Sequence, residues 1–337
     1  MKALKVLIPT LLIVSLIAVS LNSAPTMAQE TKGIILIDIS HGSYHTDYNW
    51  FVGNWTEKGF DVMVWSNPNV TLSSLLNDSV KAVLLPGAKV PYSDADLSAL
   101  KSWFEAGNKL LWVAGDSDYG GYFNASSSLN PVLEYLGANL RLSWDAVDDT
   151  QSNDGASYRV IANETGTDEV AKCLTRDVKR AVFHGPTSVL GWENNAPVDL
   201  RNTTIDGVSV VMKSSAAAKT IDQDVSLNPT YDYYTYTAKN ITGNYPLLVV
   251  QFMKNSMLVV SGEANFADYK NMYGLITEHG DEQQGKILVD NIMAYVLLNE
   301  KCAVAENETG GGFLPGFTFY LIGFSFLLVA TIIIKRR

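Results

Sequence analysis

The sequence predicts an α/β fold in which a doubly wound parallel sheet carries a β-rich insertion. Three observations lead to this prediction. Short apolar runs alternate with helix-like segments from Gly33 to Gly137, and the same alternation returns between Leu247 and Leu298. Residues 141–245 are instead polar and aromatic, with only short strand-like runs. Strands that alternate with helices favour a parallel sheet covered by helices on both faces.

Four continuous apolar runs are predicted to be strands buried on both faces, as is typical of parallel sheets. Right-handed crossovers between them leave flavodoxin-like or Rossmann-like strand orders, and we expect a flavodoxin-like sheet. The runs are residues 34–37, 62–65, 82–85 and 110–113.

Helices are predicted between these strands. Ser93 begins the clearest one, because its hydroxyl can accept from the amide of Asp96 while the Asp96 carboxylate reaches back, as in a capping box. Gly107 is expected to cap the C-terminal end of this helix. The other helices are expected at 47–58, 72–76 and 129–136.

Residues 141–245 are interpreted as a β-rich insertion, with strand-like runs at 158–161, 181–183 and 208–212. The tyrosines of segment 231–236 alternate as in a half-buried strand, and their faces would also suit stacking on sugars. After the insertion we expect a hairpin of strands 247–252 and 257–260, and then a final helix at 283–298.

Both ends of the chain indicate export and membrane attachment. Residues 1–28 are typical of a secretory signal peptide, with an uncleaved N-terminal anchor as the alternative. The apolar stretch 318–334 follows a linker at 303–317 and is predicted to be a transmembrane helix. The basic tail 335–337 marks the cytoplasmic side, so the domain at 30–300 would face outward.

Composition excludes nucleic acid as a partner, because the net charge is −10 and nucleic-acid binding needs a basic footprint. The two cysteines, Cys173 and Cys302, are expected to form a disulfide in an oxidising exterior, with two free buried thiols as the alternative.

Eight Asn-x-Ser/Thr sequons are candidate glycan acceptors on surface loops, as expected of an exported chain. Chance enrichment in a chain rich in Asn, Ser and Thr is the alternative. The sequons begin at Asn54, Asn69, Asn77, Asn124, Asn163, Asn202, Asn240 and Asn307.

Two regions resemble known families. The run 93–115, together with the closing hairpin, Ser261-Gly262-Glu263 and the last helix, resembles the class I glutamine amidotransferase-like superfamily. It looks like the non-catalytic relatives, which include the DUF4350 group and the domain found in intraflagellar transport proteins. At the C-terminus, Pro-Gly-Phe at 315–317, the apolar span and the basic end resemble the archaeal PGF-CTERM sorting signal, in which a lipid replaces the span.

The first resemblance implies a fold but not the family's chemistry. Catalytic members place a cysteine nucleophile on the turn after the strand that corresponds to 110–113. Here residues 114–118 contain no cysteine, and the last loop has no His-x-Glu motif. We therefore expect no amidotransferase activity.

Polar residues that follow the first and fourth strands form the candidate site, because the carboxyl ends of parallel strands open into one crevice. We expect Asp38, His41 and Asp116 to lie close together there. Imidazoles and carboxylates suit zinc or another divalent ion, while simple capping of strand ends is the alternative. The candidate ligand-binding residues are Asp38, His41, His45, Asp116, Ser117, Asp118 and His184.

The sequence thus predicts a membrane-anchored extracellular glycoprotein that binds a ligand or partner without catalysis. The alternative is a metal-assisted extracellular hydrolase that uses the crevice of Asp38, His41, His45 and Asp116. A surface protein or a carbohydrate is the expected partner, in addition to the membrane. The sequence identifies neither a cofactor nor a metal.

Overall fold

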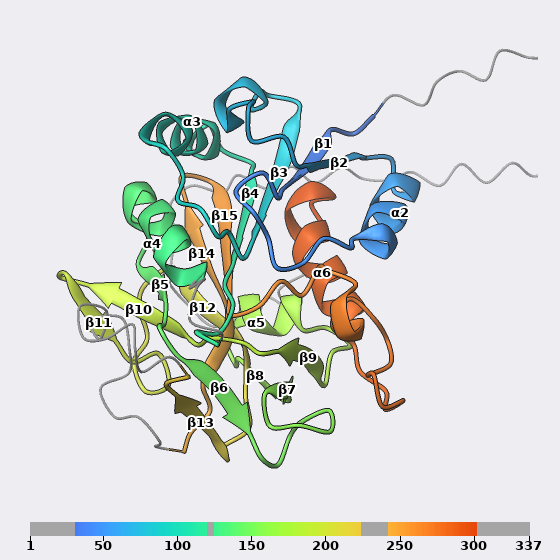
Figure 1. Ribbon diagram of the computed structural model, residues 1–337, viewed down its shortest axis with the longest axis vertical. Coiled ribbons are helices and arrows are strands. Elements are labelled where there is room, and N and C mark those ends of the chain that lie inside the picture. Colours follow the sequence, from blue (N-terminus) through green and yellow to red (C-terminus); the bar gives the residue numbers. More distant parts are fainter. Residues whose placement is uncertain (1–30, 120–124, 224–241, 302–337) are drawn as a thin grey trace, which may run out of the picture. The chain divides into compact units, whose positions relative to one another are not determined.

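The computed structural model describes residues 31–119, 125–223 and 242–301, all of which fall in the first of two units, 1–302 and 303–337. Its central feature is an eight-stranded mixed sheet with the order β2-β1-β3-β4-β15-β14-β12-β8 (Figure 1). The strands are β1 (Ile34–Asp38), β2 (Asp61–Trp65), β3 (Val80–Pro86), β4 (Leu110–Ala114), β8 (Glu164–Thr165), β12 (Val208–Lys213), β14 (Pro246–Met253) and β15 (Ser256–Ser261).

The predicted α/β class is confirmed, and the first five positions of the sheet have the flavodoxin-like order, with β15 as the fifth strand. These five strands pair in parallel. The sheet is not parallel throughout, because β14, β12 and β8 extend it with antiparallel pairs. The sheet changes from parallel to antiparallel pairing at β15, which is parallel to β4 and antiparallel to β14.

Alternate side chains of each central strand enter two separate cores. Ile35 and Ile37 of β1 pack into one core, and Leu36 packs into the other. One face of the sheet is covered by α2 (Asn49–Glu57), α5 (Glu169–Leu174) and α6 (Gly285–Leu297), and the other by α3 (Asp94–Glu105) and α4 (Ala125–Leu136) (Figure 1). Burial on both faces explains why β1, β3 and β4 are continuous apolar runs in the sequence. The prediction that 62–65 is buried in the same way is wrong, because β2 is the edge strand of the sheet, with Met63 and Val64 39% and 38% exposed.

The caps of α3 agree with the sequence pattern, apart from one bond. The hydroxyl of Ser93 accepts from the Asp96 amide at 3.2 Å, and Gly107 follows the helix with a φ of +87°. The Asp96 carboxylate accepts from the Ser93 hydroxyl at 2.6 Å and from the Leu72 amide at 2.9 Å. It therefore ties α3 to the short helix η1 (Leu72–Ser74) instead of closing a capping box.

The insertion is rich in strands and forms three small sheets beside the main one: β11-β10-β5, β13-β6 and β7-β9. Two of its strands, β12 and β8, join the main sheet. The tyrosine segment 231–236 lies outside the described residues. The strands of the small sheets are β5 (Leu140–Leu142), β6 (Ala146–Asp149), β7 (Arg159–Ala162), β9 (Ala181–His184), β10 (Val189–Glu193), β11 (Ala196–Val198) and β13 (Ala218–Ile221).

The predicted signal peptide, linker, membrane span and tail all lie outside the described residues. Within the described ranges, no helix has the length and apolar character needed to cross a membrane. Cys173, in α5, is in a disulfide. Cys302, the partner predicted for it, is outside the described residues.

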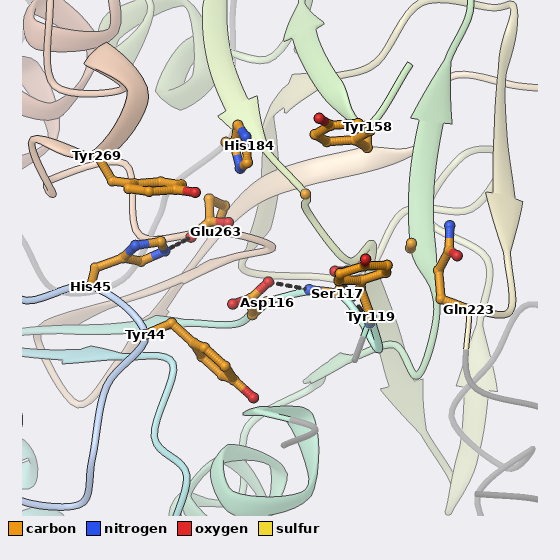
Figure 2. Close-up of a pocket in the computed structure, with 12 residues that line it drawn as sticks. Tyr44, His45, Asp116, Ser117, Tyr119, Tyr158, His184, Gln223, Glu263 and Tyr269 are labelled. Atoms are coloured by element: carbon orange, nitrogen blue, oxygen red, sulfur yellow. Dashed lines mark hydrogen bonds and ion pairs between the residues drawn. The ribbon is translucent and has the colours of Figure 1, made fainter. Parts of the chain in front are cut away.

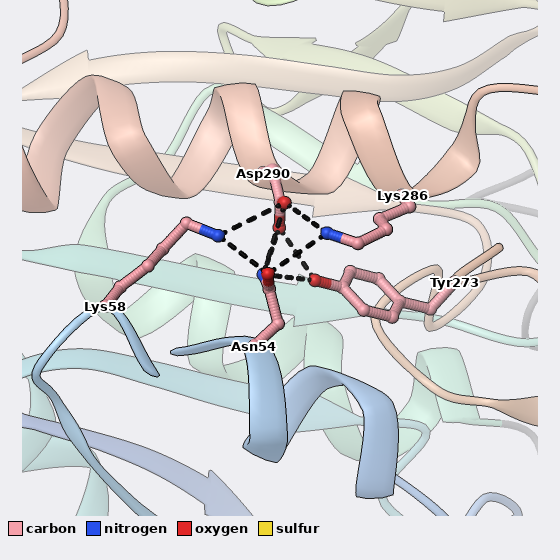
Figure 3. Close-up of polar contacts among 5 residues, drawn as sticks. All are labelled: Asn54, Lys58, Tyr273, Lys286 and Asp290. Carbon is pink, nitrogen blue, oxygen red and sulfur yellow. Dashed lines mark hydrogen bonds and ion pairs between the residues drawn. The ribbon is translucent and has the colours of Figure 1, made fainter. Parts of the chain in front are cut away.

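The sequons differ in their surroundings. Asn69, Asn77, Asn163 and Asn202 are exposed and lie between regular elements. Asn54, in contrast, lies within α2, and its side chain belongs to a polar network that reaches α6 (Figure 3). This placement corrects the expectation that all eight sequons lie on surface loops. The sequons at Asn124, Asn240 and Asn307 are outside the described residues.

Candidate ligand-binding pocket

A cavity of about 620 Å³ lies where the parallel strands end (Figure 2). The segments that follow β1, β4 and β15 form one part of its wall, and the insertion together with η3 (Tyr269–Asn271) forms the rest. The main-sheet segments contribute Tyr44, His45, Asp116, Ser117, Tyr119 and Glu263, and the other part of the wall has Ala146, Tyr158, His184, Gly185, Gln223 and Tyr269.

The centre of the wall is a cluster of His45, Asp116 and Glu263. The Nε2 atom of His45 lies 2.7 Å from Oε1 of Glu263, and these side chains are 6% and 0% exposed. Potential ligand atoms from the three residues lie within 4.8 Å of one another. Backbone amides hold both carboxylates: Ala264 donates to Glu263 and Ser117 donates to Asp116, each at 2.7 Å.

This cluster perturbs the ionisation of its members. Burial raises the pKa of Asp116 well above its ordinary value, and the Glu263 carboxylate adds to this effect. Burial opposes a charge on His45, but Glu263 and Asp116 outweigh it and raise the pKa of His45. Burial lowers the pKa of His184. Perturbed groups that line one cavity are a common mark of a functional site.

Asp38 and His41 form a separate pair. The Nδ1 atom of His41 lies 3.1 Å from Oδ2 of Asp38, and the amide and hydroxyl of Ser40 donate to Oδ1 at 2.9 and 2.6 Å. The ring of Tyr92 stacks on His41 with centroids 3.9 Å apart. These contacts are those of a strand-end cap, and neither residue lines the cavity. The histidine beside Asp116 is His45 instead of His41.

The remaining candidates lie at or near the cavity. Ser117 and His184 line it directly. Asp118 is buried behind the wall, where its Oδ2 accepts from the amide of the lining residue Gln223 at 2.9 Å. Within the described residues, no hydrogen bond joins the Ser117 hydroxyl to a histidine; its contact at 3.4 Å is with the Tyr119 amide. The site therefore contains four of the seven predicted residues, without a Ser–His pair.

Sequence reasoning missed Glu263 and the lining tyrosines. Glu263 follows β15 by two residues, so the rule that selected Asp116 after β4 would also have selected it. The tyrosines lie in loops, or at the ends of short elements, where no periodic pattern marks them. Only the fold brings Tyr44, Tyr158 and Tyr269 to one cavity.

The comparisons with known proteins bear on the fold alone. No family model and no curated protein matches the chain. Among solved structures, the "mmIFT52 N-terminal domain" is similar with a TM-score of 0.52 and 13% identity, over 78% of this chain and 97% of that one. A ThuA-like protein from Bacteroides uniformis aligns over 82% of this chain and 95% of its own, with a TM-score of 0.42 and 11% identity.

Proposed function

We propose that this protein is an extracellular, membrane-anchored ligand-binding module whose cavity takes an uncharged, polyhydroxylated ligand such as a carbohydrate. The observation that carries this proposal is the chemistry of the cavity wall, in which tyrosine rings surround a cluster of buried acceptors. The signal peptide and membrane span expected from the sequence support the location. The exposed sequons support the glycoprotein character of the module.

Four tyrosines give the wall the surfaces that sugars need. Tyr44, Tyr119, Tyr158 and Tyr269 line the cavity, and an aromatic face presents apolar area beside a polar edge. The ring of His184 meets Tyr158 and Tyr269 edge-on, at centroid distances of 5.5 and 4.9 Å. This arrangement holds aromatic groups in place on one side of the cavity.

The polar groups of the wall favour a ligand that donates hydrogen bonds. Asp116, Glu263 and Gln223 supply acceptor oxygens. Within the described residues, the wall contains no lysine or arginine, so an anionic ligand would meet two carboxyl groups that only the imidazole of His45 accompanies. Hydroxyl groups of a neutral sugar can donate to these oxygens, and charge-assisted hydrogen bonds of this kind are strong.

A binding role fits the site better than hydrolysis through the crevice expected from the sequence. That mechanism requires Asp38 and His41 beside His45 and Asp116, whereas Asp38 and His41 pair with each other and lie outside the cavity wall. Ser117 has acidic neighbours on both sides and no imidazole bonded to its hydroxyl within the described residues. Neither arrangement supplies an activated nucleophile.

The test is binding of neutral oligosaccharides to the detergent-solubilised full-length chain, measured on a glycan array and then by calorimetry. Tyr158→Ala and Tyr269→Ala should each weaken binding by about twofold to tenfold, since one stacked ring contributes about 0.5–1.5 kcal/mol. Tyr135→Ala is a matched control, because this ring is 40% exposed, against 44% for Tyr158 and 39% for Tyr269, but lies on α4. Absence of binding, or equal losses in all three variants, would overturn the proposal.

A further inference from the structure

The cluster of His45, Asp116 and Glu263 is held rigidly by the ends of three segments of the sheet. The Ser261 hydroxyl donates to the Glu263 carbonyl at 2.6 Å and accepts from the indole of Trp112 at 2.8 Å. A Cβ atom at Gly262 would lie 1.8 Å from the Thr187 carbonyl oxygen, so only glycine allows the chain to turn Glu263 into the cavity wall. The carboxylate of Glu263 is thus positioned before any ligand arrives.

Two buried atoms of this cluster have no hydrogen-bond partner within the described residues. They are Nδ1 of His45 and Oε2 of Glu263. Both side chains are more than nine-tenths buried. Buried polar atoms in native proteins are nearly always hydrogen-bonded or coordinated, so two exceptions in one cluster point to a bound group.

The charge of the cluster indicates the sign of that group. Two carboxylates face one imidazole, and within the described residues the carboxylates are bonded by His45, by backbone amides and by the side chain of Ser117, none of which except His45 can carry a positive charge. Burying carboxylates without full compensation is costly, and proteins commonly offset the charge by pairing it or by coordinating a metal. The cluster therefore suits a cation.

We propose that His45, Asp116 and Glu263 bind one divalent cation, with an open coordination position toward the cavity. An imidazole nitrogen and two carboxylate oxygens suit Zn²⁺ or Mn²⁺. Three protein ligands leave room for oxygens of a bound molecule, as in zinc sites with an open position. Since the cluster forms part of the cavity wall (Figure 2), the cation would bind hydroxyl oxygens of the ligand, and this second step rests on the proposed function.

The first test uses the metal alone. The full-length chain is stripped with chelator, dialysed against ZnCl₂ or MnCl₂, and measured by elemental analysis and calorimetry. We expect one ion per chain, and affinity at least about tenfold weaker in Glu263→Gln and His45→Gln, because each removes one ligand. Failure of the wild-type chain to bind either ion above buffer level overturns the proposal.

A matched control separates the site from other histidine–carboxylate pairs. Nδ1 of His279 lies 2.8 Å from Asp154, but His279 is half-exposed and outside the cavity wall. His279→Gln should leave ion binding unchanged, and equal loss in this variant overturns the proposal.

Asp116→Asn, at the less buried ligand, gives a second test if circular dichroism shows that a variant at a buried ligand fails to fold. Full ion binding by folded Asp116→Asn also overturns it.

The second test separates the cation from the carbohydrate. Oligosaccharide binding is measured with and without chelator. Loss of binding with chelator, restored by Zn²⁺ or Mn²⁺, supports both proposals. Ion binding without any oligosaccharide binding keeps the cation site and removes the proposed ligand. Oligosaccharide binding that chelator does not change removes the cation's role in ligand binding and keeps the proposed function.

Discussion

Asn54 begins a sequon, yet its side chain joins two helices (Figure 3). Its Nδ2 atom donates to the Tyr273 hydroxyl at 2.7 Å and to Asp290 at 2.9 Å. Its Oδ1 atom accepts from Lys58 at 2.8 Å and from Lys286 at 3.1 Å. A glycan attached to Nδ2 would displace these partners. The same atom therefore cannot both carry a glycan, as the sequon suggests, and make these hydrogen bonds.

We predict that Asn54 carries no glycan, whereas the exposed Asn69, Asn77, Asn163 and Asn202 are modified when the chain is made by cells that export and glycosylate it. Glycopeptide mass spectrometry measures occupancy at each site. Asn54→Ala should also lower the free energy of unfolding by about 1–3 kcal/mol, because it leaves partly buried partners unpaired. A glycosylated Asn54 in the folded protein would contradict this prediction.

Asp145 should make stability depend on pH. Burial raises the pKa of this carboxyl from the ordinary 3.8 to about 6, against the opposing effect of hydrogen bonds from Ser143, Thr187 and Ser188. The folded state therefore retains a proton that the unfolded state has lost. The resulting stability is fully present below about pH 3.8 and is lost as the pH rises to about 6, up to about 3 kcal/mol in all.

Urea unfolding at a series of pH values between 4 and 7 measures this contribution. Asp145→Asn cannot ionise, so the part of the pH dependence that comes from this residue should disappear in the variant. Above about pH 6, Asp145 is ionised in both the folded and the unfolded state. The slope of the free energy of unfolding against pH should therefore differ least between the original protein and the variant in that range. If the free energy of unfolding changes with pH in the same way in both proteins between pH 4 and 6, the pH dependence does not come from Asp145.

The site residues divide according to whether local sequence reveals them. Asp116 follows a fully buried strand, and that position alone predicted a place at the crevice. His41 and His45 both follow the first strand, so the sequence does not distinguish them. The three-dimensional structure does, because Tyr92 stacks on His41 and Glu263 pairs with His45. The partner of His45 lies 218 residues away in the chain, beyond any spacing argument.

The elements that the sequence predicted well are those in which nearly every side chain is apolar and buried. In the parallel region, β1, β3, β4 and β15 are buried on both faces and are apolar runs, whereas the edge strand β2 is partly exposed although its sequence is equally apolar. The helix α4 begins at Ala125, four residues before the expected start, because its first turns bury polar side chains. Ser126 donates to the Ser143 carbonyl and Asn130 donates to the Leu142 carbonyl, and such residues look like a loop when their partners are unknown.

The turn between β14 and β15 offers a test at the level of one element. Lys254 and Asn255 have φ angles of +50° and +60°. The turn between β10 and β11 has nearly the same angles, +51° and +58°, but with asparagine at both positions, Asn194 and Asn195. Asparagine tolerates this left-handed region better than lysine does. We therefore expect Lys254→Asn to stabilise the protein by about 0.5–1 kcal/mol.

Denaturant unfolding midpoints measure the change. Lys219→Asn is the control, since Lys219 is an exposed strand residue of β13, where asparagine is unfavourable. It should leave stability unchanged or lower it. A lower midpoint for Lys254→Asn than for the original chain would show that the turn does not limit stability.

For the whole molecule, we predict that Cys173 pairs with Cys302 and so ties α5 to the end of the folded unit. A non-reducing peptide map should contain the joined peptides. Cys302→Ser should cost about 2–4 kcal/mol of stability, because the bond closes a loop of about 130 residues in the unfolded chain. Two free thiols in the oxidised, folded protein would contradict the pairing.

The position of β15 in the sheet also constrains the order in which the chain can fold. It lies between β4 and β14, but Ala114 and Ser256, which end β4 and begin β15, are separated by the entire insertion. Until residues 256–261 have been synthesised, one edge of β4 lacks its native partner. Contacts of such long sequence separation slow folding. The native pairing of β4 is therefore completed only after residues 256–261 are available, and exposed strand edges of this kind are where chains misassociate.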